Sequence, residues 1–144
     1  MFRRVLVAWD CSPGAAAALR AAAGVVDSIA PHLVVLAVIQ PTSHVESAEE
    51  GAAEMDRRRQ QVHDSFARAM DETPDAKRAG ASLHIVEAHD VARAVCDYTR
   101  AHDFDLVVLG RHGVGGAFHP RLGHIAQAVA KHTEVPLLLM GRPH

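Results

Sequence analysis

Five short apolar runs alternate with segments of helical periodicity, and this alternation constrains the fold of the chain more than any other feature. The runs cover residues 5–9, 33–39, 82–86, 105–109 and 135–140. Continuous apolar runs of this length are typical of strands that are buried on both faces of a parallel sheet. The segments between them are long enough for crossover helices, so the sequence predicts an α/β fold in the order βαβαβαβαβ.

Capping residues and apolar faces mark the predicted helices. Ser12 followed by Pro13 is typical of a helix N-terminus, and the face of this helix is expected to hold Leu19, Ala23 and Val26. A second helix is expected at about 48–70, with an apolar stripe of Met55, Val62, Phe66 and Met70. Residues 71–80 are expected to form a turn. A third helix should bury Val91, Ala94, Val95 and Tyr98, and a last one should run from 123 to about 132.

Composition limits the number of domains and the classes of partner. The 144 residues, of which 49% are hydrophobic, fit a single globular domain over 1–144. A net charge of −2 and an aromatic content of 4% argue against a nucleic-acid partner. The apolar runs are too short to span a bilayer, and the first residues lack the features of a signal peptide. Cys11 and Cys96 form no CxxC pair, so we expect reduced thiols in a cytoplasmic protein.

A glycine-rich segment follows the fourth apolar run. Glycines stand at 110, 113, 115 and 116, and Gly123 stands where the last helical pattern begins. Glycines allow backbone N–H groups to approach an anion closely, and a helix N-terminus favours negative charge. The segment therefore predicts an anion-binding loop between a strand and a helix.

Three pieces of the chain resemble the universal stress protein family. They are residues 5–13, residues 105–113, and Gly123 with its helix and residues 134–140. The nucleotide-binding signature of that family is G-x2-G-x9-G followed by Ser or Thr. Gly110, Gly113 and Gly123 keep this spacing, and His124 stands at the position of the hydroxyl residue.

The resemblance implies a Rossmann-like (flavodoxin-like) three-layer fold with a parallel sheet in the order 3-2-1-4-5 and helices on both faces. It also implies ATP or a related adenine nucleotide, with or without Mg²⁺, bound where the strand order reverses. By motif position, Ala8, Asp10 and Val38 would surround the adenine and its neighbouring groups. Leu109, Gly110 and Gly113 would lie along the ribose and phosphates, and the helix start at Gly123, His124 and Ile125 would meet the phosphates.

Several roles stay open at this point. The His124 imidazole either donates to a phosphate or fills the phosphate pocket. Asp10 either contacts the ligand or caps the first helix. The histidines at 112, 119 and 124 have no metal-ligand spacing, and no metal site is predicted. The glycine loop lacks the GK[ST] of a P-loop, and no catalytic constellation is evident.

These observations favour an ATP-binding regulatory module of the stress response rather than an enzyme. Two alternatives remain: a family member that acts through protein–protein contacts without ATP, and a weak ATP hydrolase. Pro136 lacks a backbone N–H, which places the fifth strand at a sheet edge. A second copy of the chain would cover this apolar edge, so a homodimer through Val135, Leu137 and Leu139 is expected.

Overall fold

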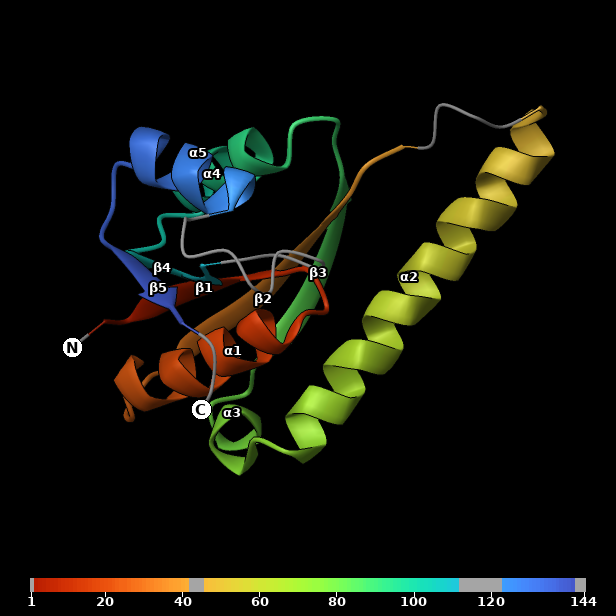
Figure 1. Ribbon diagram of the computed structural model, residues 1–144. Helices are drawn as coiled ribbons and strands as arrows, with labels where there is room; N and C mark the ends of the chain where they lie inside the picture. The colour runs from red at the N-terminus through yellow and green to blue at the C-terminus, as the bar shows by residue number, and fades with distance from the viewer. Residues whose placement is uncertain (1, 42–45, 112–122, 142–144) are drawn as a thin grey trace.

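The computed structural model describes residues 2–41, 46–111 and 123–141 and contains one parallel sheet of five strands (Figure 1). The strand order is β3-β2-β1-β4-β5, as the resemblance implied. The strands are β1 (Arg4–Trp9), β2 (His32–Ile39), β3 (Ser82–Glu87), β4 (Leu106–Gly110) and β5 (Leu137–Met140). The chain order reverses between β1 and β4, which lie side by side at the centre of the sheet.

Helices cover both faces of the sheet. They are α1 (Pro13–Val25), α2 (Ala48–Asp71), α3 (Pro74–Arg78), α4 (Val91–Ala101) and α5 (His124–His132). Parallel crossovers are right-handed, so α1, α2 and α3 share one face while α4 and α5 cover the other (Figure 1). Within the described residues, no helix has both the length and the apolar character required to cross a membrane.

Strand β1 supplies side chains to two separate core layers. Val5, Val7 and Trp9 pack toward α1 and α2, whereas Leu6 and Ala8 pack toward α4 and α5. This alternation follows from the period of two in a strand. The last two residues of β1 therefore direct their side chains to opposite faces of the sheet.

The structure corrects three details of the predicted elements. Residues 74–78 form the short helix α3 instead of the expected turn. Pro74 stands at the start of this helix, where its fixed φ is compatible with helical backbone. Val26 is the C-cap of α1 with extended backbone, so it does not belong to the helical face. Helix α4 buries Val95 and packs Val91 and Tyr98 against the core as predicted, but its other buried side chains are Ala92, Cys96 and Thr99.

Candidate functional site

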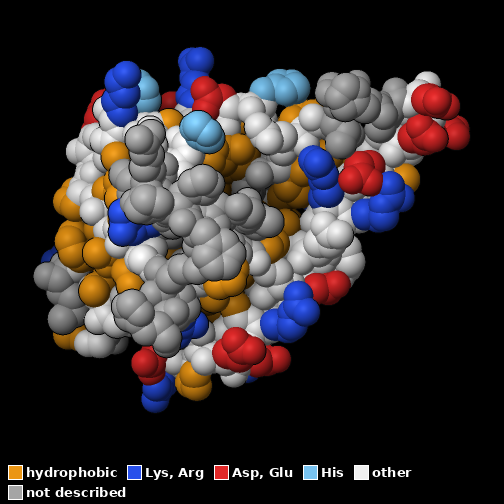
Figure 2. Space-filling view, viewed as in Figure 1, with side chains coloured by type: hydrophobic (Ala, Val, Ile, Leu, Met, Phe, Trp, Pro, Cys, Tyr) orange, Lys and Arg blue, Asp and Glu red, His pale blue; other side chains and the backbone are white. Residues whose placement is uncertain are grey.

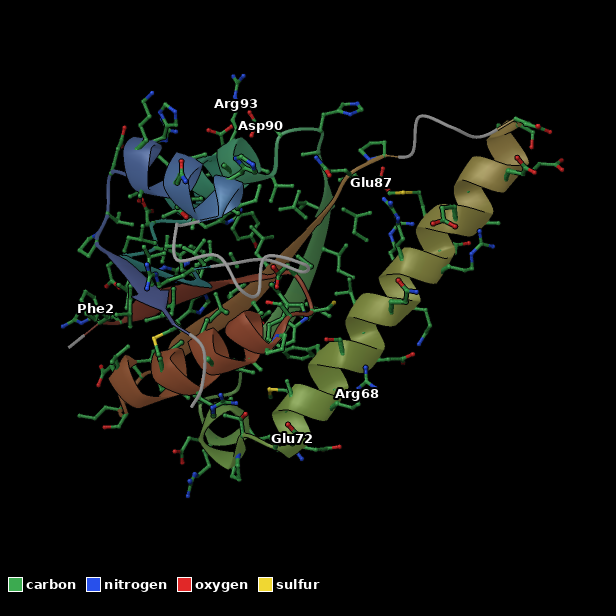
Figure 3. All side chains as sticks on the ribbon, viewed as in Figure 1. Phe2, Arg68, Glu72, Glu87, Asp90 and Arg93 are labelled. Atoms are coloured by element: carbon green, nitrogen blue, oxygen red, sulfur yellow. The ribbon has the colours of Figure 1, made fainter. Side chains whose placement is uncertain are left out.

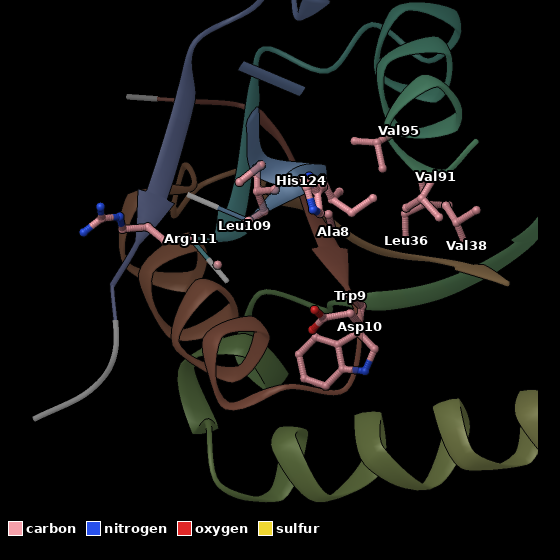
Figure 4. Close-up of a pocket in the computed structure, with 14 residues that line it drawn as sticks. Ala8, Trp9, Asp10, Leu36, Val38, Val91, Val95, Leu109, Arg111 and His124 are labelled. Atoms are coloured by element: carbon pink, nitrogen blue, oxygen red, sulfur yellow. The ribbon is translucent and has the colours of Figure 1, made fainter. Parts of the chain in front are cut away.

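A cavity of about 390 Å³ opens at the carboxyl ends of β1 and β4, between the sheet and helices α4 and α5 (Figure 4). This volume lies within the range of small-molecule sites. Eight of the nine residues singled out on the sequence line it: Ala8, Asp10, Val38, Leu109, Gly110, Gly123, His124 and Ile125. The ninth, Gly113, lies outside the described residues.

Aliphatic side chains form one wall of the cavity. Ala8 and Leu36 pair across β1 and β2, and Val38 follows on the same face of the sheet. Val91 and Val95 of α4 complete this wall. The sequence did not indicate that Leu36, Val91 and Val95 line the cavity. The right-handed sense of the crossovers could have indicated the two α4 residues. It places α4 next to α5, on the sheet face above the point where the strand order reverses.

Asp10 joins the end of β1 to the start of α1. One carboxylate oxygen, Oδ1, accepts a hydrogen bond from the backbone N–H of Ser12 at 3.0 Å, and Ser12 Oγ accepts from Ala15 N–H at 3.1 Å. Asp10 is exposed at the cavity, and its second oxygen has no hydrogen-bond partner in the part of the chain that the structure describes. Asp10 thus supports the turn into α1 from a position at the cavity.

The opposite end of the cavity is formed by the start of α5. Gly123 is the N-cap residue of this helix, and no side chain caps it. The Gly123 N–H donates to the carbonyl of Arg111 at 2.8 Å, and the Arg111 N–H donates to the carbonyl of Met140 at 2.9 Å. The Gly123 N–H is therefore occupied, and the N–H groups of the first turn after it are the ones that lack intrahelical acceptors.

His124 is the first residue of α5 and is exposed at the cavity, next to the partly exposed Ile125. No acidic residue stands in the first turn of α5. A helix N-terminus without an acidic side chain favours an anionic ligand. Among the described residues, no group of three or more His, Cys, Asp or Glu side chains is placed to hold a metal ion.

The strand order and the cavity define a flavodoxin-like α/β protein with a cavity at the point where its strand order reverses. The model of the universal stress protein family matches residues 1–140. The chain therefore belongs to the universal stress protein family. No curated protein sequence matches it.

Solved structures of this family share the fold. The chain is similar to universal stress protein UspA from Lactobacillus plantarum, with a TM-score of 0.82, 19% identity, and coverage of 96% of this chain and 97% of that one. The universal stress protein from Archaeoglobus fulgidus in complex with dAMP has a TM-score of 0.61 and 19% identity, covering 96% and 97%. A family member from Arabidopsis thaliana with AMP bound has a TM-score of 0.59 and 18% identity, covering 98% and 92%.

Proposed function

We propose that this universal stress protein binds ATP or a related adenine nucleotide in the cavity and acts as a nucleotide-dependent regulatory module in stress response. The observation that carries the proposal is the gathering of eight motif-position residues around one cavity where the strand order reverses. The bound dAMP and AMP of the relatives from Archaeoglobus fulgidus and Arabidopsis thaliana support the same class of ligand.

The chemistry of the cavity suits the parts of such a nucleotide. The aliphatic wall of Ala8, Val38 and Val91 offers a dry surface to the flat faces of a base. The Asp10 carboxylate accepts hydrogen bonds from an amino or hydroxyl group. The first turn of α5 faces the phosphates, with the His124 imidazole as an additional donor. Mg²⁺, where it accompanies ATP, would be held mainly by phosphate and water oxygens.

Calorimetric titration of the full chain with AMP and with ATP tests this proposal. We expect a Kd below about 1 mM for at least one of them, which corresponds to about −4 kcal/mol. Val91→Trp places an indole in the cavity and should weaken binding at least about tenfold, or by about 1.4 kcal/mol. The matched variant Arg93→Trp lies on the same helix but outside the cavity lining, and should bind as the wild type does.

If neither nucleotide binds, the alternative of a family member that acts through protein–protein contacts replaces this proposal. If ATP binds, a titration of His124→Ser decides between the two roles of the imidazole. A large loss of ATP affinity identifies His124 as a phosphate ligand, whereas equal or tighter binding identifies a side chain that fills the phosphate pocket.

The second part of the proposal is a homodimer through β5. The carbonyl of Pro136 accepts a hydrogen bond from the N–H of Val107 in β4 at 3.0 Å, and the carbonyl of Met140 accepts one from the N–H of Arg111, directly after β4, at 2.9 Å. Backbone groups alternate in direction along a strand, so the N–H and C=O groups of Leu137 and Leu139 point away from β4, at the edge of the sheet. A second copy that pairs with Val135, Leu137 and Leu139 would satisfy these groups.

We also propose that the 144 residues form one domain that works in the cytoplasm. Both cysteines are free, Cys11 at the surface and Cys96 in the core. Free thiols are typical of a reducing compartment.

A further inference from the structure

Helix α2 makes sparse contact with the rest of the molecule for its length. It has 24 residues, of which Met55, Val62 and Ala69 are buried. In Figure 1 it runs along the side of the sheet, and its N-terminal turns extend beyond the strands. Figure 2 shows acidic and basic side chains along its surface and hydrophobic side chains between it and the body of the molecule. The attachment of α2 therefore depends on few groups.

One aromatic contact and two polar contacts join α2 to the carboxyl ends of β1, β2 and β3. The rings of Trp9 and Phe66 meet edge to face, with centroids 6.4 Å apart and an interplanar angle of 87°. Arg58 donates to the carbonyl of Gln40, directly after β2. Arg59 pairs with Glu87, the last residue of β3, on the side that faces α2 (Figure 3).

The carboxyl ends of β1 and β2, two of these three strands, also line the cavity. Trp9 lines the cavity between Ala8 and Asp10, while its ring points toward α2 (Figure 4). Gln40 stands two residues after Val38, and its side-chain amide donates to the carbonyl of His89 at 2.8 Å, just before α4. A ligand that contacts the end of β1 or β2 therefore acts on residues that also hold α2.

The contact between Trp9 and α2 leaves one polar group unsatisfied. Trp9 is 5% exposed, and its buried indole N–H has no hydrogen-bond partner among the residues that the structure describes. A buried donor without an acceptor costs free energy, and native structures contain few of them. A shift of the indole that gives this N–H a carbonyl or a water as acceptor removes that cost. The unsatisfied N–H therefore lowers the stability of the packed position of Trp9.

We infer that Trp9 couples the nucleotide cavity to α2: a nucleotide bound against the end of β1 shifts the indole, and its contact with Phe66 changes how α2 packs on the sheet. This inference rests on the proposed function. According to this inference, the packing of α2 on the sheet differs between the empty and the occupied cavity. The nucleotide shifts α2 only to the extent that it binds the two positions of Trp9 with different affinity.

The coupling is tested on the full chain with AMP and with ATP. Trp9 is the single tryptophan of the sequence, so intrinsic fluorescence reports its surroundings directly. We expect a change in tryptophan emission that saturates with the calorimetric Kd. Amide hydrogen exchange in peptides from residues 55–66 should change by about threefold or more on binding.

The variant Phe66→Leu separates binding from coupling. Phe66 does not line the cavity, so affinity should stay within about twofold of the wild type while the exchange response of α2 is lost. Met70→Leu, one turn further along the same face, should keep both affinity and response.

Each other outcome overturns a distinct claim. Tight binding with unchanged exchange in α2 overturns the coupling and leaves the proposed function intact. An equal response in Phe66→Leu overturns the route through Trp9 and Phe66. Absence of binding by both nucleotides overturns the proposed function and the coupling together.

Discussion

A Cβ atom on Gly110 would lie 3.0 Å from both the Cα and the carbonyl carbon of Gly14, so the end of β4 meets the first turn of α1 with no side chain between them. The motif spacing suggested a role for Gly110 beside the ribose and phosphates. The structure adds a packing role, because the missing side chain faces α1 while the residue itself lines the cavity. Close approach of two backbones is a common reason for glycine.

We predict that Gly110→Ala destabilises the fold. The added methyl group meets backbone atoms that cannot rotate away, and overpacking of this kind costs about 1–3 kcal/mol. Gly24→Ala is the matched control, because a Cβ there has no neighbour within 4 Å and the residue lies in α1. It should be neutral or stabilise by up to about 1 kcal/mol. Urea denaturation of the three proteins checks this, and equal stability of both variants would contradict the packing role.

The two serine caps should differ in their effect on stability. Ser12 is buried and caps α1 beside the cavity, whereas Ser47 caps the exposed start of α2. Ser12→Ala should lower the free energy of unfolding by about 1–2 kcal/mol. Ser47→Ala should cost less than about 0.5 kcal/mol globally, since the first turn of α2 can fray without opening the core. Chemical denaturation measures both, and a larger loss in Ser47→Ala would refute this difference.

His32 should make the fold less stable in mild acid. His32 is exposed at the start of β2, and partial desolvation of its imidazole, with smaller effects of Arg4 and His84, holds its pKa below the ordinary value. The folded state therefore binds this proton less readily than the unfolded chain does. The contribution of neutral His32 is fully present above about pH 6.5 and is lost as the pH falls through the lowered pKa. Thermal melting from pH 8 to pH 5 should show a shallower decline in His32→Gln, and parallel curves would exclude His32 as a source.

The dimer prediction concerns the outward backbone of β5. Leu139→Pro removes an N–H that points away from β4, so it should abolish pairing with a second copy while sparing the sheet. Sedimentation velocity at micromolar concentration should show a dimer for the wild type and a monomer for the variant. Ile85→Pro on the opposite edge strand, β3, is the control and should remain dimeric. A wild-type monomer under these conditions would refute the dimer.

Local signals predicted the elements well. Ser12 and Pro13 marked the start of α1, and Pro136 marked β5 as an edge strand. Asp105 was assigned to β4, but it lies just before the strand, where its carboxylate accepts hydrogen bonds from the backbone N–H groups of Arg3 and Arg4. Such a contact joins residues about a hundred positions apart, and periodicity carries no information about it.

The candidate site was predictable only in part. The glycine spacing and the strand ends located the cavity, because strands β1 and β4 meet where the chain order reverses. Val91 and Val95 were predicted on the apolar face of α4, but their place in the cavity depends on how α4 packs beside α5, which periodicity does not indicate. The side chain of Trp9 points away from the cavity and packs against α2, because side chains alternate between the two faces of a strand.

Amide chemical-shift mapping of the full chain with AMP and with ATP tests most directly whether an adenine nucleotide binds in the cavity. We expect saturable shifts for Ala8, Asp10, Val38, Val91 and His124, which share the cavity at the carboxyl ends of the strands. Thr99 and Val135, which line a separate crevice between α4, α5 and the start of β5, should not shift. The absence of shifts around the cavity with both nucleotides, or shifts confined to the other crevice, would exclude this cavity as the nucleotide site.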